Sequence, residues 1–172
     1  MKLGVVMDPI SAINFKKDSS LSILLEAQSR DYELYYMEPA SLFLRENGAK
    51  ALMQSIVVKD DSQDWFKLSE SKETRLADLD MIIMRQDPPF NLNYITATYI
   101  LEHLYPKTIV INNPESVRNA PEKIYVTFFK HLMPPTLISE NINQIKKFVK
   151  QYKEVIIKPL YEKGGKEIFK IN

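Results

Sequence analysis

Residues 80–111 read DMIIMRQDPPFNLNYITATYILEHLYPKTIVI, and they carry the clearest signal for the fold class. The apolar run at 80–84 predicts a buried strand. After the turn residues DPPF, residues 92–105 predict a helix, and the run TIVI at 108–111 predicts a second strand. A strand, a helix and a strand in succession predict a parallel pair joined by a crossover helix.

The same alternation occurs earlier in the chain. The run KLGVVM at 2–7 predicts a buried first strand, and Asp18 is a candidate cap for a helix whose apolar positions in 21–27 repeat at helical spacing. Residues 33–37 (ELYYM) predict another strand. Residues 40–79 are less regular, and their SIVVK and WFKL segments predict a small antiparallel excursion. We therefore expect an α/β fold with a mainly parallel, doubly wound sheet.

The pattern changes near residue 120. The predicted elements are a helix that starts at Pro121 and stops at Pro134-Pro135, a strand TLIS at 136–139, a helix at 141–151, a strand EVIIK at 154–158, a glycine-containing loop, and a strand EIFKI at 167–171. This β-α-β-β order is typical of the start of a new domain. We therefore predict one domain over residues 1–120 and the beginning of a second over residues 121–172.

Composition narrows the class of protein. Hydrophobic residues make up 45% and charged residues 26% of the chain, as in globular proteins with a real core. There is no cysteine, so disulfides and thiolate metal sites are excluded. The first apolar run is too short for a signal peptide or a membrane helix, so we expect a cytoplasmic protein without a membrane partner.

Charge is unevenly distributed along the chain. Residues 1–120 carry 13 Lys and Arg against 17 Asp and Glu, whereas residues 121–172 carry 10 against 5, giving net charges of −4 and +5. The basic part contains lysines but no arginine, which argues against a nucleic-acid partner. A small anionic ligand fits this distribution better.

Lys158 is the first candidate for binding such an anion. It closes the apolar strand and precedes Gly164 and Gly165, whose backbone N–H groups could approach the same phosphate. The pattern lacks the Walker sequence, and a strand-end lysine beside an ordinary hairpin turn is an equal alternative. Lys123, in the first turn of a predicted helix, is by itself explained by solvation, but together with Lys158 it could flank one polyphosphate.

Arg85 is the second candidate, because it follows a buried strand at the edge where open α/β sheets bind ligands. Its planar guanidinium suits a carboxylate, although an ion pair with Asp87 that braces the turn is the alternative. The helix start at Asp18, Ser19 and Ser20 could also bind an anion, and plain N-capping explains Asp18 and Ser19 almost as well. Asn112 and Arg118 follow the TIVI strand at the same sheet edge and could complete the pocket.

Together these segments resemble one family, the prokaryotic glutathione synthetases of the ATP-grasp superfamily. The matching segments are KLGVVMDPI, KKDSS with LLEAQ, YYME, LADLD, MRQDPPF with YITATYILE, NNPESVRNAPEK, PPTLIS, and IIKPL followed by GG and IF. They occur in order along nearly the whole chain, and the block from DPPF to ATYILE is specific.

The resemblance implies an ATP-dependent carbon–nitrogen ligase that joins γ-glutamylcysteine to glycine through an acyl phosphate, with magnesium. It implies that Lys123 and Lys158 hold ATP, with Gly164-Gly165 in the loop over its phosphates. Arg85, the DPPF loop and the turn at residues 18–20 match the side that holds γ-glutamylcysteine. Residues 1–120 then correspond to the Rossmann-like, pre-ATP-grasp substrate domain, and residues 121–172 to the start of the α+β ATP-grasp fold.

Several features depart from the family pattern. Glu162 and Glu167 stand in the glycine loop where glycine is common, while Gln86 and Asn91 are milder changes from a usual lysine and aspartate. The family also continues beyond residue 172, and the resemblance places its magnesium ligands in that further part. We therefore expect no catalytic residue and no metal ligand in this portion, and no activity from the isolated chain.

Two functional interpretations remain open. The first is the N-terminal portion of a glutathione synthetase, and the second is a non-catalytic α/β module that binds a dipeptide or a nucleotide. The open macromolecular partners are a second chain supplying the remaining ATP-grasp half and further copies of the chain in a homo-oligomer.

Overall fold

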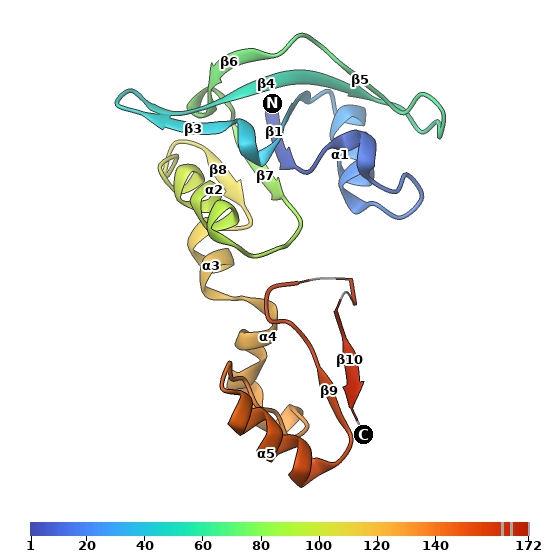
Figure 1. Ribbon diagram of the computed structural model, residues 1–172. Coiled ribbons are helices and arrows are strands. Elements are labelled where there is room, and N and C mark those ends of the chain that lie inside the picture. Colours follow the sequence, from blue (N-terminus) through green and yellow to red (C-terminus); the bar gives the residue numbers. More distant parts are fainter. Residues whose placement is uncertain (163, 166, 172) are drawn as a thin grey trace. The chain divides into compact units, whose positions relative to one another are not determined.

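The computed structural model describes residues 1–162, 164–165 and 167–171. These residues form two compact units (Figure 1). Unit 1 comprises Met1–Asp87 and Asn91–Arg118, and unit 2 comprises Pro88–Phe90 and Asn119–Asn172. The chain therefore enters unit 2 briefly at Pro88–Phe90, the last three residues of the DPPF segment, and enters it again after Arg118.

Unit 1 is built on one eight-stranded sheet among the described residues. Its parallel strands, in spatial order, are β2 (Glu33–Met37), β1 (Lys2–Met7), β7 (Met81–Arg85) and β8 (Ile109–Ile111). The antiparallel strands are β3 (Leu42–Arg45), the long β4 (Gly48–Val58), β5 (Phe66–Leu68) and β6 (Lys72–Arg75). The predicted parallel strands and the antiparallel excursion are both confirmed.

Two helices cover opposite faces of the parallel strands. Helix α1 (Ser19–Ser29) packs with alternate residues of β1, including Val5, in one buried cluster, whereas α2 (Leu92–Glu102) packs with Val6 in the other. Alternate residues of a strand point to opposite faces of the sheet, so neighbours on β1 face different helices. This arrangement confirms the predicted doubly wound α/β class.

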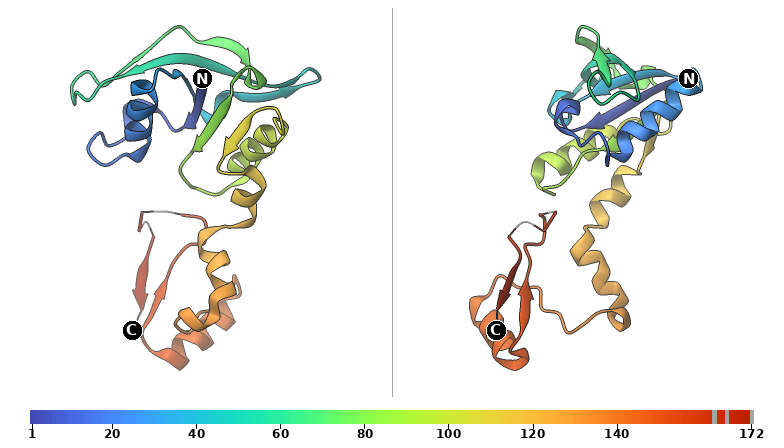
Figure 2. Two further views of the ribbon diagram at one scale, coloured as in Figure 1. Left: turned by 180° about the vertical axis from the view of Figure 1, so that it is seen from behind. Right: turned by 90° about the vertical axis from the view of Figure 1, so that its right-hand side faces the viewer.

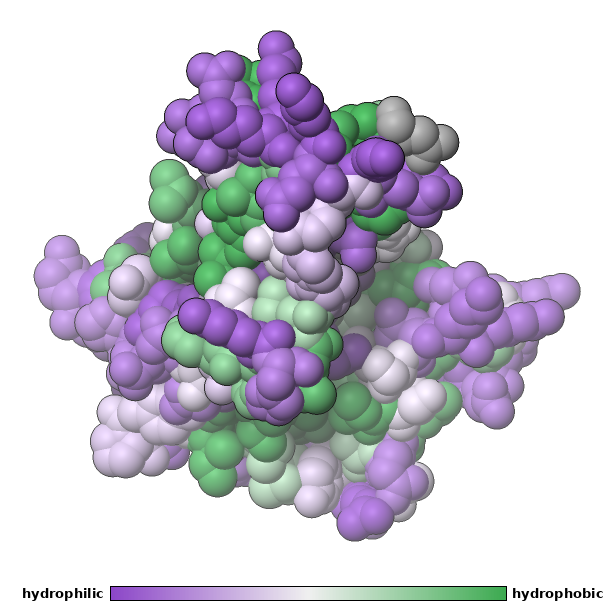
Figure 3. Space-filling model, turned by 90° about the horizontal axis from the view of Figure 1, so that it is seen from below, coloured by the Kyte–Doolittle hydropathy of each residue, from purple (hydrophilic) through white to green (hydrophobic). Residues whose placement is uncertain are grey.

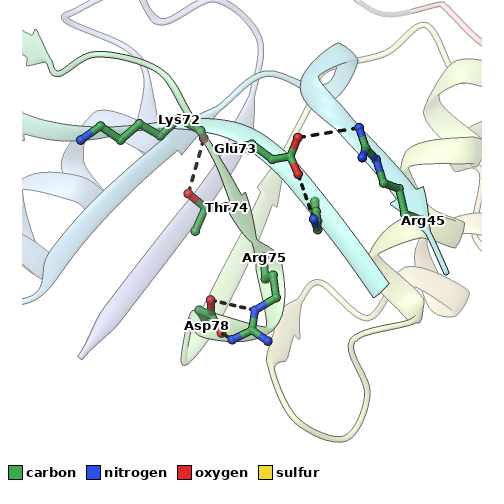
Figure 4. Close-up of polar contacts among 7 residues, drawn as sticks. Arg45, Lys72, Glu73, Thr74, Arg75 and Asp78 are labelled. Atoms are coloured by element: carbon green, nitrogen blue, oxygen red, sulfur yellow. Dashed lines mark hydrogen bonds and ion pairs between the residues drawn. The ribbon is translucent and has the colours of Figure 1, made fainter. Parts of the chain in front are cut away.

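The antiparallel strands are joined by charged side chains. Lys50 Nζ on β4 lies 2.8 Å from Glu73 Oε1 on β6, and Arg45 Nη2 on β3 lies 3.8 Å from Glu73 Oε2 (Figure 4). At the end of β6, Arg75 binds Asp78 at 2.9 Å. The hydrogen bond from Lys50 lowers the pKa of the Glu73 carboxyl. One carboxylate thus bridges three strands.

Unit 2 contains α4 (Glu122–Tyr125), a 3-10 segment (Val126–Leu132), α5 (Ile142–Tyr152), and an antiparallel hairpin of β9 (Val155–Ile157) and β10 (Phe169–Ile171) (Figure 2). The predicted helix at 141–151 and the last two predicted strands are confirmed within a few residues. Large apolar side chains remain exposed in this unit, among them Phe128 and Leu132. Figure 3 shows hydrophobic residues (green) at the surface among hydrophilic ones (purple).

Two predictions in this part of the chain are wrong. The helix predicted between Pro121 and Pro134 is not continuous. It changes to 3-10 geometry after Tyr125, and the backbone of Phe129 is not helical (φ −109°, ψ 51°). The β-branched and aromatic side chains of residues 124–129 lose rotamer freedom in a helix, which accounts for the break. The TLIS segment at 136–139 is exposed and forms no strand, because none of the described strands pairs with it.

Candidate functional site

The candidate site in unit 1 lies where the connections leave the sheet in opposite directions. The chain passes from β1 through α1 to β2 on one side, and from β7 through α2 to β8 on the other. β1 and β7 are neighbours, with Met7 paired in register with Arg85. In open α/β sheets, ligands bind outside the carboxyl ends of strands at this kind of switch point. Asp8 and residues 85–87 occupy that position.

Arg85 is held in a defined orientation by the first turn of α1. Its Nε donates to Ser20 Oγ at 3.1 Å, and its Nη2 donates to Ser19 Oγ at 2.7 Å. Arg85 itself is exposed. Three of the predicted site residues, from two separate elements, are therefore in contact. A guanidinium oriented by hydroxyl groups and open to solvent is suited to bind a carboxylate.

Asp18 makes the contacts of a helix cap. Its Oδ1 accepts from the Ser20 N–H at 2.6 Å and from the Leu21 N–H at 3.3 Å. These bonds satisfy two of the free donors in the first turn of α1. The carboxylate therefore holds the turn that presents Ser19 and Ser20 to Arg85.

Two residues near Arg85, Asp8 and Tyr94, were not named as candidates from the sequence. The Asp87 N–H donates to Asp8 Oδ2 at 2.8 Å, which ties the loops after β7 and β1 together. Burial raises the pKa of the Tyr94 phenol, the charges of Asp87 and Asp8 raise it further, and Arg85 lowers it. Asp8 could have been found from the sequence, because it directly follows a predicted strand at the same edge of the sheet.

Tyr36 stabilises the loop after β1 from the neighbouring strand β2. Its hydroxyl accepts from the Ile10 N–H at 3.2 Å and donates to Glu38 Oε1 at 2.9 Å. Burial, and then the hydrogen bond to Glu38, raises the pKa of this phenol to about 12. The loop that carries Asp8 is therefore fixed at both of its ends.

The two remaining candidates in unit 1 occupy different environments. Asn112 directly follows β8 and is exposed. Arg118 contacts α2 instead: its Nη2 lies 2.6 Å from Glu102 Oε2, its Nη1 donates to Thr98 Oγ1 at 3.3 Å, and its Cζ lies 4.0 Å from the centre of the Tyr99 ring. The contacts of Arg118 therefore hold helix α3 (Pro114–Asn119) against α2.

The candidate phosphate-binding residues all lie in unit 2. Lys158 directly follows β9 and is exposed. Gly164 and Gly165 have φ angles of +65° and +75°, and no heavy atom lies within 4 Å of the position a Cβ would occupy at either. Glycine adopts such φ angles without strain, and apart from the chain neighbours nothing occupies the space that a side chain would fill at either residue. Lys163 and Lys166, on either side of this glycine pair, lie outside the described residues.

Lys123 contacts the loop that follows β9. Its Nζ donates to the carbonyl oxygen of Glu162 and lies 3.5 Å from that of Leu160. The joint role predicted for Lys123 and Lys158, to flank one polyphosphate, stays a prediction.

Metal sites and membrane spans are both absent from the part of the chain that the structure describes. No group of three or more His, Cys, Asp or Glu side chains is arranged to hold a metal ion there. None of the helices in that part has the length and apolar character needed to cross a membrane.

Comparison with family models covers nearly the whole chain. Residues 1–118 match the model of the prokaryotic glutathione synthetase N-terminal domain, and residues 122–172 match the model of the ATP-grasp domain of the same synthetase. The chain belongs to the prokaryotic glutathione synthetase family. The resemblance inferred from the sequence segments is thereby confirmed.

Curated members of the glutathione synthetase family are similar along the full chain. The glutathione synthetase of Rhodopseudomonas palustris is 46% identical over 171 residues, which are 99% of this chain and 55% of the relative. That of Escherichia coli strain K12 is 46% identical over 172 residues, which cover 54% of the relative. The chain thus spans about half the length of the glutathione synthetases it matches.

A solved structure supports the fold independently of sequence. D-alanyl-alanine synthetase A from Vibrio cholerae superposes with a TM-score of 0.57 at 13% identity, over 99% of this chain and 52% of that one. At such low identity the likeness concerns the fold alone. It agrees with the α/β architecture of this glutathione synthetase family member.

Proposed function

We propose that this chain provides the γ-glutamylcysteine site and part of the ATP site of a glutathione synthetase, which ligates γ-glutamylcysteine to glycine. In this proposal residues 1–120 form the substrate domain and residues 121–172 begin the ATP-grasp domain. The observation that carries the proposal is the Arg85 guanidinium, oriented by Ser19 and Ser20 at the carboxyl end of β7. Family membership supports the choice of reaction.

The charges around Arg85 suit a γ-glutamyl peptide. Such a peptide carries carboxylates and one α-ammonium group at neutral pH. Arg85 supplies a fork for a carboxylate, and Asp8 and Asp87, whose loops are joined by a hydrogen bond, supply negative charge for an ammonium. A site with both signs of charge favours a zwitterionic ligand over a simple anion.

The reaction itself has two steps. A substrate carboxylate oxygen attacks the γ-phosphorus of ATP, so that an acyl phosphate forms and ADP leaves. The glycine amine then attacks the acyl carbon and loses a proton, and as the C–N bond forms the acyl C–O bond breaks and inorganic phosphate leaves. In this scheme Arg85 orients the dipeptide, Lys158 offsets phosphate charge, and the backbone N–H groups of Gly164 and Gly165 donate to phosphate oxygens.

Magnesium is also implied by the family, and the described residues do not supply a cluster of three or more side chains that could hold it. Magnesium prefers several oxygen ligands including carboxylates. No His, Cys, Asp or Glu cluster of the required size occurs in residues 1–162, 164–165 and 167–171. We therefore assign no step of the reaction to a metal bound by these residues.

The dipeptide site is tested by replacing Arg85 with alanine. Loss of a charge-assisted hydrogen-bonded pair costs about 1.5 to 3 kcal/mol, so binding of γ-glutamylcysteine is expected to weaken by roughly 10- to 150-fold. Isothermal titration calorimetry of the wild-type protein and Arg85→Ala measures this difference. Arg45→Ala is the matched control, because Arg45 is an exposed arginine on β3. Equal affinities of wild type and Arg85→Ala would rule out the assigned role.

The ATP site is tested by replacing Lys158 with alanine. If its ammonium binds a phosphate oxygen, ATP binding weakens by a similar factor, about 10- to 150-fold. Lys147→Ala on α5 is the control, since it removes the same charge from another exposed position of unit 2. Equal weakening by both variants would indicate a general charge effect and would contradict a specific role for Lys158.

A further inference from the structure

Three successive backbone carbonyls in the loop after β9 accept hydrogen bonds from elsewhere in unit 2. Lys123 Nζ donates to Glu162 O and lies 3.5 Å from Leu160 O. Between these two, the Tyr161 carbonyl accepts from the Phe90 N–H at 3.1 Å. The two donors come from segments more than thirty residues apart in the chain, α4 and the DPPF segment. The loop segment 160–162 is thus bound from two directions.

An aromatic contact reinforces the second of these anchors. The rings of Phe90 and Tyr161 stack, with centroids 6.2 Å apart and planes inclined by 26°. This distance lies within the range of favourable aromatic pairs. Phe90 therefore holds Tyr161 through both its backbone and its side chain.

Residues 160–162 lie between the candidate phosphate-binding residues, so the contacts that hold them bear on the candidate ATP site. Residues 160–162 connect Lys158 to Gly164, the two candidates for phosphate binding. Exposed loops vary in conformation unless their backbone groups are satisfied by fixed partners. Anchoring three consecutive carbonyls sets the path of the backbone at residues 160–162.

We propose that Phe90 and Lys123 form a latch that fixes residues 160–162, and that both act as positioning residues for Lys158, Gly164 and Gly165. The link to ATP rests on the proposed function, whereas the latch itself does not. Lys123 then serves the nucleotide by shaping the loop, with its ammonium satisfied by backbone carbonyls. Phe90 has no role in this proposal other than to hold Tyr161.

The Phe90 amide reports directly on the latch, because its N–H is the donor to Tyr161. Its hydrogen-exchange rate, measured by NMR without nucleotide, is expected to rise about two- to tenfold in Tyr161→Ala, which removes the stacked ring. Tyr161→Phe keeps the ring and should keep the wild-type rate. Lys123→Met should also accelerate exchange at Phe90, because it releases the carbonyls on both sides of Tyr161. An unchanged Phe90 rate in both Tyr161→Ala and Lys123→Met overturns the latch.

The positioning role is tested with ATP as the probe. ATP should bind about two- to tenfold more weakly to Tyr161→Ala than to wild type, and Tyr161→Phe should restore the affinity. Phe128→Ala is the control, since Phe128 is an exposed aromatic residue of the same unit. Faster exchange with unchanged ATP affinity would refute the positioning role. If wild type fails to bind ATP, the proposed function fails, and the exchange rates still decide whether the latch exists.

Discussion

Replacing Ile82 with alanine is expected to lower the free energy of unfolding of unit 1 by about 2 to 5 kcal/mol. Ile82 has no exposed surface and lies on β7, where it pairs in register with Gly4 on β1 and Val110 on β8. It belongs to the buried cluster under α2 that includes Leu101. Neighbours on both sides are parts of the sheet, so they have little freedom to close the cavity left by the missing atoms.

The measurement uses the single tryptophan of the chain as its reporter. Trp65 lies in unit 1, with its ring 4.7 Å from that of Phe66 and 6.1 Å from that of Phe15. Its fluorescence in a urea titration therefore follows the unfolding of this unit. Ile109→Ala on β8 is the matched control, because this side chain is 54% exposed and should cost well under half as much. Equal losses would show that Ile82 is not a central core residue.

Replacing Arg118 with alanine is expected to cost about 2 to 4 kcal/mol of stability, because it removes the ion pair with Glu102, the hydrogen bond to Thr98 and the cation–π contact with Tyr99. The arginine side chain is only 13% exposed, so water replaces these contacts poorly. The loss should also loosen the attachment of α3 to α2. Urea unfolding followed at Trp65 measures the effect.

The control for Arg118 is another arginine–glutamate pair, which lies on the surface. Arg30 and Glu26 form a short ion pair on α1, but their side chains are 66% and 62% exposed. Exposed pairs of this kind contribute little to stability, because water screens the two charges. Arg30→Ala should therefore change stability little. A large loss in Arg30→Ala, or a negligible one in Arg118→Ala, would show that burial does not set the strength of these two ion pairs.

The same variant also separates two interpretations of Arg118. The sequence suggested a substrate-binding residue, since Arg118 follows the β8 strand at the ligand edge of the sheet. A residue that mainly holds α3 to α2 should lose stability on substitution and should leave γ-glutamylcysteine affinity nearly unchanged in the folded protein. If Arg118 instead binds substrate, its substitution should lower the affinity for γ-glutamylcysteine and leave the stability nearly unchanged.

Much of unit 1 could be predicted because its strands and helices carry strong local patterns. The apolar runs at 2–7 and 81–84 are long enough to be read as buried strands, and Asp18 marks the start of α1. The face that each strand residue presents follows from simple alternation. Local sequence and tertiary packing agree in this unit, which is why the expected α/β class is confirmed.

Unit 2 was predicted less well because its sequence signals conflict. The segment 124–129 is apolar enough for a helix, but its β-branched and aromatic side chains disfavour one, and the structure breaks at Phe129. The TLIS run has the composition of a strand, but a strand also needs a hydrogen-bonding partner, which no local pattern can supply. Pairing between distant segments decides such cases.

The site shows the same division between local and distant information. Arg85 could be named because its position at the end of β7 is a local feature, whereas its contacts with Ser20 and Ser19 join residues 65 and 66 positions apart. The attachment of Lys123 to the 160–162 carbonyls spans 37 to 39 positions and has no counterpart in the sequence pattern. The residue types were enough to suggest anion binding, whereas the partners of Arg85 and Lys123 became known only from the fold.

The interleaved course of the chain limits where the protein can be divided. A gene cut between codons 118 and 119 respects the boundary between the two family models, but it leaves Pro88–Phe90 with the upstream product. A separately produced fragment beginning at Asn119 would then lack the Phe90 amide and ring that Tyr161 contacts. A short synthetic peptide containing the DPPF sequence, added to that fragment, would be the natural means of replacing them.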